Sequence, residues 1–421
     1  MENVIPIATV RWKTEAHHFQ LQRKFALMNS GIVPASAYSR DAEYLRALKV
    51  DSLRIDVGWG ARWVGHTRPV VTPDGFDFGE VDDIARALNE VGVKPYLAYC
   101  YVPEEFRADP ESWRSLAFPP DGWVAMIHSY VRGANSRGVS IGYHEVFNEP
   151  DLSDEITGEK IFFDGDKEAY LELYRRTSRA IKAADPTALV GGPSTGSVHA
   201  NLDWIEDFLD TVEKEHLPID FISFHQYGRF AAAAAWNPVL ALLENRVYFS
   251  DVDLHLNEYN AFPIVYPPGG AQENLPMAAA MLAEFDRLLA IPRITLVHWA
   301  QFQDSGYGLY CGLLDIYGRT KPPYWAFRWY SDIADQPRLE SGSDTDGLGS
   351  FVTRRAHEIE GIVWNRTGRT QQVELRSADG DATAPYELSY LPAETNMTPE
   401  RRAPASVFTL RPNDVVRFRA R

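Results

Sequence analysis

One strand-helix unit can be read in the stretch from residue 52 to residue 91, which begins SLRIDV (residues 52–57) and ends EVDDIARALNEV (residues 80–91). The first segment carries the apolar residues of a short strand. In the second segment, apolar residues recur at the three- and four-residue spacing that places them on one helical face. The stretch therefore predicts a β-strand followed by an amphipathic α-helix.

The same alternation continues from about residue 29 to residue 335. Strands are expected at residues 31–33, 52–57, 94–99, 143–147, 188–192, 220–224, 253–256 and 294–299. Helices are expected at residues 80–91, 123–134, 167–184, 202–214, 237–244, 276–289 and 325–333. Eight such units predict an α/β fold, a closed parallel (β/α)8 barrel, the TIM barrel. Periodicity alone leaves open a doubly wound sheet, because it does not show closure.

The alternation of strand and helix patterns ends at about residue 337. Short segments rich in β-branched and aromatic residues follow at 350–354, 360–364, 371–376, 386–390, 406–410 and 414–418. Because Gly, Asp, Asn or Pro separates them, they predict a C-terminal antiparallel β-sandwich domain. Residues 7–12 can add a strand to it. We therefore expect an N-terminal segment (1–28), a catalytic barrel (29–337) and a β-sandwich (338–421).

The overall charge and hydrophobicity exclude several classes of protein. The chain has 58 Asp and Glu against 42 Lys and Arg, a net charge of −16, so a nucleic-acid partner is not expected. No apolar run of about 18 residues exists, so we expect no membrane association. The N-terminus lacks the basic and apolar regions of a secretory signal, which predicts a cytoplasmic protein.

Cofactors and metals are not expected either. The chain has only two cysteines, too few for a disulfide framework or a cysteine zinc site. Its 11 histidines show no metal-ligand spacing such as HExxH.

Two glutamates stand directly after predicted strands of the barrel. The fourth strand runs into Phe147-Asn148-Glu149-Pro150, and the seventh into Asn257-Glu258. In a barrel the carboxyl ends of the strands form the functional face. Two glutamates there can face each other across the barrel mouth, as retaining glycosidases require. Asn148 and Asn257, which precede them, can hydrogen-bond a sugar hydroxyl or hold the carboxylate.

These motifs resemble the retaining (β/α)8 glycoside hydrolases of clan A. The C-terminal sandwich, the segment FISFHQY (residues 221–227) and Trp299 at the eighth strand are most similar to glycoside hydrolase family 39, the family of β-xylosidases and α-L-iduronidases. The resemblance implies a carbohydrate substrate, with Glu149 as general acid/base and Glu258 as nucleophile. The segment WAQFQD (residues 299–304) lacks the adjacent acidic pair expected there in a β-xylosidase. The resemblance therefore does not settle the sugar.

Further side chains are expected to bind substrate or to support the glutamates. His225 can bind a sugar hydroxyl, Tyr227 can keep Glu258 ionised, and Trp299 can form the floor under a sugar ring. Arg54 can pair with a catalytic carboxylate, with Asp56, or with both. Trp59 and Asp304 complete the predicted substrate-binding residues. A structural histidine and a core tryptophan are the alternative readings for His225 and Trp299.

Several alternatives remain open at this stage. Gly192-Pro193-Ser194-Thr195-Gly196 fits the G-x-S-x-G pattern of an esterase, although no helix follows the serine at once. A sugar-binding protein without turnover and an inverting enzyme, with carboxylates farther apart, are two others. Within the retaining reading, exo action on small glycosides or oligosaccharides is expected, and an endo-acting glycanase is the alternative. The sandwich can also serve as a contact in a homo-oligomer.

Overall fold

A computed structural model of the chain describes residues 7–13, 20–30, 33–59, 68–196, 201–228, 236–262, 270–305, 309–378 and 385–420. The chain forms two compact units. One consists of Lys24–Asn260 and Ile291–Tyr307, and the other of Met1–Arg23, Ala261–Ala290 and Gly308–Arg421. These units are discontinuous in sequence, unlike the consecutive segments that the sequence suggested.

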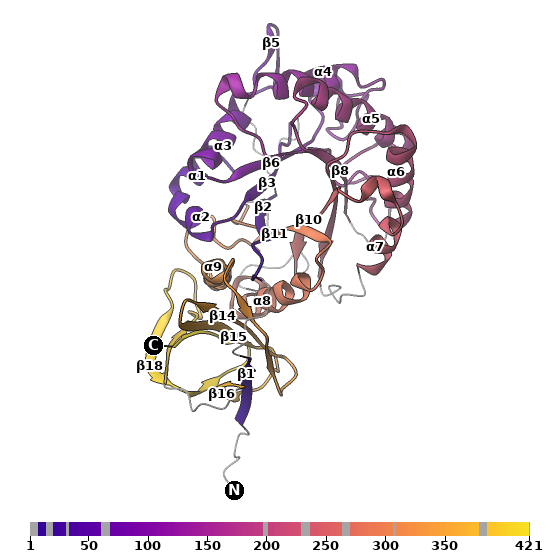
Figure 1. Ribbon diagram of the computed structural model, residues 1–421. Helices are drawn as coiled ribbons and strands as arrows, with labels where there is room; N and C mark the ends of the chain where they lie inside the picture. The colour runs from indigo at the N-terminus through magenta and orange to yellow at the C-terminus, as the bar shows by residue number, and fades with distance from the viewer. Residues whose placement is uncertain are drawn as a thin grey trace. The chain divides into compact units, whose positions relative to one another are not determined.

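The first unit contains a closed parallel barrel (Figure 1). Around the ring its strands are β10 (Asp253–Asn260), β11 (Ile294–Ala300), β2 (Phe25–Asn29), β3 (Ser52–Asp56), β6 (Lys94–Tyr99), β7 (Tyr143–Val146), β8 (Val190–Thr195) and β9 (Phe221–Tyr227). Neighbouring strands pair in parallel throughout, and β9 pairs with β10 to close the ring. The predicted barrel is therefore confirmed, and the alternative of an open, doubly wound sheet is excluded.

Helices follow the barrel strands along the chain. In this unit they are α1 (Ala35–Arg40), α2 (Ala42–Leu48), α3 (Gly79–Glu90), α4 (Asp121–Gly133), α5 (Lys167–Ala184), α6 (Leu202–Glu215) and α7 (Asn237–Leu243), with a hairpin of β4 (Val71–Thr72) and β5 (Gly75–Phe76) before α3. Helix α5 illustrates how particular residues set the ends of a helix. Asp166 caps it by accepting from the Ala169 amide at 2.8 Å, and Asp185 ends it before Pro186.

The first barrel strand differs from the prediction. It lies at Phe25–Asn29, whereas the sequence suggested residues 31–33, of which 31 and 32 lie outside the described residues. All five residues of β2 are buried. A parallel strand covered on both faces shows no apolar-polar alternation. For that reason the short run FALMN was not recognised as a strand.

The second unit contains two sheets around a common apolar core. One has the order β13 (Ser341–Ser343), β1 (Ile7–Trp12), β16 (Gln371–Ser377) and β19 (Val407–Leu410). The other has the order β12 (Arg338–Leu339), β14 (Leu348–Arg355), β15 (Glu358–Asn365), β20 (Val415–Arg419), β17 (Tyr386–Tyr390) and β18 (Glu400–Ala405). Side chains of both sheets meet in the core, where the Trp12 ring stacks on Phe418 at 5.8 Å.

Strand β1 joins this sandwich, as the sequence suggested. It pairs in parallel with β16 and antiparallel with β13, so the sandwich is not antiparallel throughout. Strand β18 was missed because its residues, ERRAPA, are mostly exposed and lack an alternating apolar pattern. The same unit holds α8 (Leu275–Leu289) and α9 (Pro322–Ile333), which pack together through Phe285 and Phe327, 5.4 Å apart. Over the described residues, no helix has the length and apolar character needed to cross a membrane.

Candidate active site

The two glutamates singled out by the sequence lie at the carboxyl ends of barrel strands. Glu149 follows β7, and Glu258 lies near the end of β10, three strands further around the ring. A register shift in the pairing of β10 with β9 falls between Leu256 and Glu258. Such a bulge lets consecutive residues face the same side of a sheet. Asn257 and Glu258 can therefore both point into the barrel.

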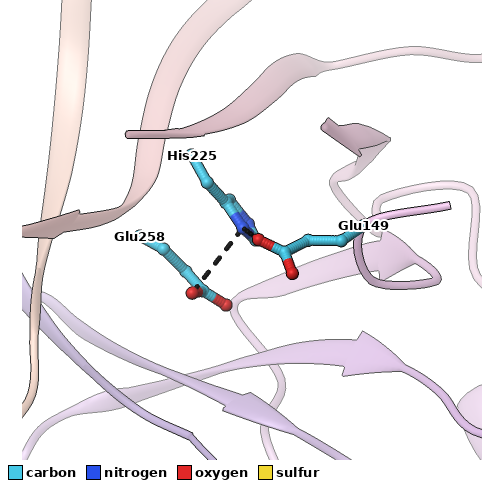
Figure 2. Close-up of side chains that lie close together, drawn as sticks. All are labelled: Glu149, His225 and Glu258. Carbon is cyan, nitrogen blue, oxygen red and sulfur yellow. Dashed lines mark hydrogen bonds and ion pairs between the residues drawn. The ribbon is translucent and has the colours of Figure 1, made fainter. Parts of the chain in front are cut away.

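His225, on β9, lies between the two carboxylates (Figure 2). Its Nδ1 atom is 2.7 Å from Glu149 Oε1 and 3.6 Å from Glu258 Oε2. One oxygen of each glutamate and one ring nitrogen all lie within 4.8 Å of one another. An approach this close of one oxygen from each carboxylate favours the retaining arrangement, with carboxyl groups roughly 5–5.5 Å apart, over the 6.5–9.5 Å of inverting glycosidases.

Arg54, on β3, organises the charges around Glu258. Its guanidinium is fully buried, and Nη1 donates to Glu258 Oε1 at 2.7 Å and to Asp56 at 3.0 Å. Nε donates to Glu145 at 2.8 Å. Nη2 donates to Asn148 Oδ1 at 2.7 Å and to the Ser194 hydroxyl at 3.2 Å, so each of the three guanidinium nitrogens has a partner. Arg54 therefore makes both of the ion pairs considered from the sequence.

Tyr227 and Asn148 also contact this arrangement. The Tyr227 hydroxyl donates to Glu258 Oε2 at 2.7 Å, a short bond typical of a charged acceptor. The Asn148 amide donates to the Tyr101 hydroxyl at 3.1 Å while its oxygen accepts from Arg54. Asn148 is thereby held beside Glu149.

Below the mouth, Glu145 and Asn257 form a buried layer. Both are fully buried, and the Asn257 amide donates to Glu145 Oε1 at 2.6 Å and to the Tyr96 hydroxyl at 3.3 Å. These contacts hold Glu145 where it accepts from Arg54. The Asn257 amide thus binds groups of the protein and is not directed at a substrate. Glu145 was not singled out from the sequence, although a charged residue in the middle of a buried strand signals a specific partner.

Burial raises the pKa values of both glutamates by different amounts. Burial raises the pKa of Glu149 to about 8, and Asp151 adds to this rise. Burial also raises the pKa of Glu258, to about 7, while Arg54 opposes the rise. Burial lowers the pKa of His225 to about 4, so its ring is neutral at pH 7. Burial thus raises the pKa of Glu149 further than that of Glu258, where Arg54 opposes the rise.

The backbone at the strand ends adopts unusual conformations. Phe147, Glu149 and Ser194 have φ values of 71°, 42° and 57°, in the left-handed region that residues other than glycine seldom occupy. The Glu149 amide donates to the Ser194 carbonyl at 3.0 Å, which ties two of these positions together. Such conformations cost about 1–3 kcal/mol each and are characteristic of functional sites.

Three residues predicted to bind substrate are deeply buried. Trp59 is 2% exposed, and its ring stacks on Tyr99 at 5.9 Å and meets Trp123 edge-on, so it belongs to an aromatic cluster behind the barrel strands. Trp299 is fully buried and packs edge-on against Tyr259 at 5.7 Å. Asp304 is 6% exposed. A sugar contact stays a prediction for each of them.

The cluster of Glu149, His225 and Glu258 has the donor types of a metal site. Two carboxylate oxygens and one imidazole nitrogen are ligands that zinc accepts. However, Arg54 places a permanent positive charge 2.7 Å from Glu258, which opposes a second cation at the same carboxylate. The arrangement suits proton transfer and nucleophilic attack better than metal binding.

The barrel and its facing glutamates define a glycoside hydrolase of the (β/α)8 type. The sequence profile of glycosyl hydrolases family 39 matches residues 49–369, and the chain belongs to this family. The resemblance drawn from the sequence is thus confirmed.

Individual relatives agree with this assignment. A β-xylosidase of Caldicellulosiruptor saccharolyticus is 29% identical over 69% of the chain and 64% of its own length. A β-xylosidase of Geobacillus stearothermophilus is 24% identical over 71% of the chain and 65% of its own length. The chain therefore spans slightly less than two thirds of these relatives.

Solved structures support the fold. A monomeric β-xylosidase from Caulobacter crescentus CB15 has a TM-score of 0.73 at 19% identity, with 98% of this chain and 99% of that chain covered. The family 39 enzyme from Xanthomonas axonopodis pv. citri has a TM-score of 0.74 at 18% identity, covering 99% and 97% of the two chains. At these identities the likeness establishes the fold, the barrel with its β-sandwich.

Proposed function

We propose that this protein hydrolyses O-glycosides with retention of configuration, by double displacement between Glu258 and Glu149. The observation that carries the proposal is the close approach of the two carboxylates, one oxygen of each lying within 4.8 Å of the other at the barrel mouth. Their side chains are 6% and 10% exposed, so each remains accessible at one edge while the rest is buried. That geometry fits direct attack on a sugar and leaves little room for a water molecule between sugar and carboxylate.

The environments of the two glutamates support the division of roles. Glu258 accepts from Arg54 and Tyr227, two donors that stabilise its ionised form. Glu149 has no such cation in contact in the described part of the chain, and its pKa of about 8 keeps it protonated at neutral pH. The ionised residue is the better nucleophile, and the protonated one can act as the acid.

The reaction then follows in two balanced steps. First, a Glu258 oxygen bonds to the anomeric carbon, the bond to the leaving oxygen breaks, and that oxygen takes the proton of Glu149. Second, ionised Glu149 removes a proton from water, and the resulting hydroxyl bonds to the anomeric carbon while the ester bond to Glu258 breaks. Glu149 ends protonated and Glu258 ionised, as at the start.

A β-xyloside is the substrate that we propose. Two relatives that share 29% and 24% identity with the chain are β-xylosidases, which supports a pentose in the reacting subsite. We propose exo action on small glycosides or oligosaccharides, and internal cleavage of a polysaccharide is the alternative. The cytoplasmic location expected from the sequence stays a prediction.

A panel of nitrophenyl glycosides of both anomers tests the substrate and the chemistry together. We expect turnover of the β-xyloside that is lost in Glu258→Gln. Turnover that persists in this variant would overturn the role of Glu258. If the panel is inert, digestion of xylo-oligosaccharides separates the remaining outcomes. Release of single end sugars supports exo action, internal cuts support the endo alternative, and binding without cleavage refutes catalysis.

The role of Glu149 is tested by substrates that need no acid. Glu149→Ala should still be glycosylated by substrates with activated leaving groups, and added azide should accelerate its turnover by replacing water as the nucleophile. Glu258→Gln should fail with the same substrates. The reverse pattern would exchange the two roles.

A further inference from the structure

Ser194 has a place in the site that the proposed chemistry does not yet use. It lies in β8, is fully buried, and was noted in the sequence only as part of an esterase-like pattern. Among the described residues, its hydroxyl contacts Arg54 Nη2 at 3.2 Å and His225 Nε2 at 3.0 Å. A buried hydroxyl between a guanidinium and an imidazole is not exposed for attack on an ester.

The directions of these hydrogen bonds follow from the donor inventory. Arg54 only donates, so the Ser194 oxygen accepts from it. Among the described residues, the His225 Nε2 atom at 3.0 Å is the acceptor within reach of the hydroxyl proton. When that bond is made, the neutral imidazole carries its own proton on Nδ1, which lies 2.7 Å from Glu149 Oε1 and donates to it. These hydrogen bonds form a series in which each group donates to the next, from Arg54 through Ser194 and His225 to Glu149.

We propose that Ser194 is a positioning residue that fixes the tautomer of His225 and thereby assigns the acid proton of Glu149 to Oε2. This inference deepens the proposed function and rests on it. Because Oε1 is occupied by the His225 Nδ1 proton, only Oε2 is free to hold the proton that passes to the leaving group. Without the Ser194 hydroxyl, the ring can adopt the tautomer protonated at Nε2. Its Nδ1 atom would then accept a hydrogen bond from protonated Glu149 instead of donating one.

The local backbone supports a positioning role. The Ser194 carbonyl accepts from the Glu149 amide at 3.0 Å, and the Ser194 amide donates to the Ser223 hydroxyl at 3.1 Å. With its φ of 57°, Ser194 sits where glycine would be less strained. The two hydrogen bonds of its buried hydroxyl can offset the cost of this backbone conformation.

The charge environment decides the direction of the expected pH effect. The charged and titratable groups around Glu149 come from several barrel elements; they are Asp151, Glu145, Arg54, Asp56, His225 and Glu258. Donation from His225 stabilises the ionised form of Glu149 and opposes the rise of its pKa caused by burial. Loss of the Ser194 hydroxyl should therefore raise the pKa of Glu149 further.

The test compares the pH profiles of kcat/KM in three variants. Ser194→Ala and Ser194→Gly both remove the hydroxyl, but glycine also relieves the left-handed backbone. Both should move the alkaline limb, which reports deprotonation of Glu149, up by about one pH unit and leave the acid limb in place. Ser52→Ala, a matched control, removes a buried hydroxyl that contacts a different histidine, His298 Nε2 at 2.9 Å, and should move neither limb.

Several results would overturn the proposal. An unchanged alkaline limb in both Ser194 variants would do so, as would an equal displacement in Ser52→Ala. The ¹⁵N shifts of the His225 ring in the unaltered protein, assigned with His225→Asn, give a second readout that needs no folded Ser194 variant. Protonation at Nδ1 supports the proposal and protonation at Nε2 refutes it. Loss of the proposed glycosidase function would appear separately, as absent turnover by the unaltered protein.

Discussion

Removal of the Tyr227 hydroxyl should change the pH profile of the protein in a defined direction. Tyr227→Phe keeps the ring and deletes only the donor that lies 2.7 Å from Glu258 Oε2. A hydrogen bond to a charged group contributes about 1.5–3 kcal/mol. Because a pKa change of one corresponds to about 1.4 kcal/mol, the pKa of Glu258 should rise by about 1–2.

The consequence for catalysis depends on the starting values. The pKa values of Glu258 and Glu149 are about 7 and about 8, so the active form, with Glu258 ionised and Glu149 protonated, is most populated between these values. In Tyr227→Phe the acid limb moves up to or beyond the alkaline limb. At pH 6 kcat/KM should fall about 10- to 100-fold, and the loss should shrink as the pH rises.

The assay is kcat/KM between pH 5 and pH 9 on the aryl glycoside that is turned over fastest. Tyr99→Phe is the matched control, because its hydroxyl lies 2.7 Å from His144 Nδ1 and contacts neither glutamate. The control should keep the pH profile of the unaltered protein. An equal loss of activity at every pH in Tyr227→Phe, with the acid limb unmoved, would refute the reasoning.

Three further changes test other parts of the account. Arg54→Met should leave Glu145, Asp56 and Glu258 without their shared cation, so urea unfolding at pH 7 should show a loss of about 3–5 kcal/mol. The loss should be smaller at pH 5, because burial raises the pKa values of Asp56 and Glu258 to about 6 and about 7 and both take up protons there. Glu149→Gln should match the unaltered protein in stability at pH 4. At pH 9 it should be more stable by up to about 5 kcal/mol, because the raised pKa of Glu149 contributes stability that is complete below its unfolded value of about 4.5 and is lost progressively as the pH rises to about 8; equal stability at both pH values would contradict this. Trp59→Phe should lower stability by about 1–3 kcal/mol and leave KM unchanged, since its ring packs on Tyr99, and a raised KM would favour a role in substrate binding.

The barrel and its glutamate pair could be predicted from the sequence because both depend on local order. Each apolar strand is followed by a helix, and a polar residue that directly follows a strand must lie at the mouth. The same reasoning paired Tyr227 with Glu258, since both stand at strand ends. It did not place β2, because a strand buried on both faces has no alternating pattern to find.

Other features depend on contacts between distant segments. Arg54 and Glu145 are 91 positions apart, so the charge of each was visible in its strand but the partner was not. Trp59 stands near a strand end, as a substrate-binding residue would, yet it packs into an aromatic cluster with Tyr99 on β6 and Trp123 on α4, which lie far from it in the sequence. Ser194 matched an esterase pattern, and its burial and its two partners, which only the structure shows, are the basis of the positioning role that we propose.

The covalent intermediate offers the most direct test of the two-glutamate mechanism. The protein would be incubated with the 2-deoxy-2-fluoro form of the aryl glycoside that it turns over, which slows release of the sugar from the enzyme. Mass spectrometry of the digested protein should then locate the added sugar on the peptide that contains Glu258. A label on Glu149, or inversion at the anomeric carbon with no label on either residue, would contradict the mechanism.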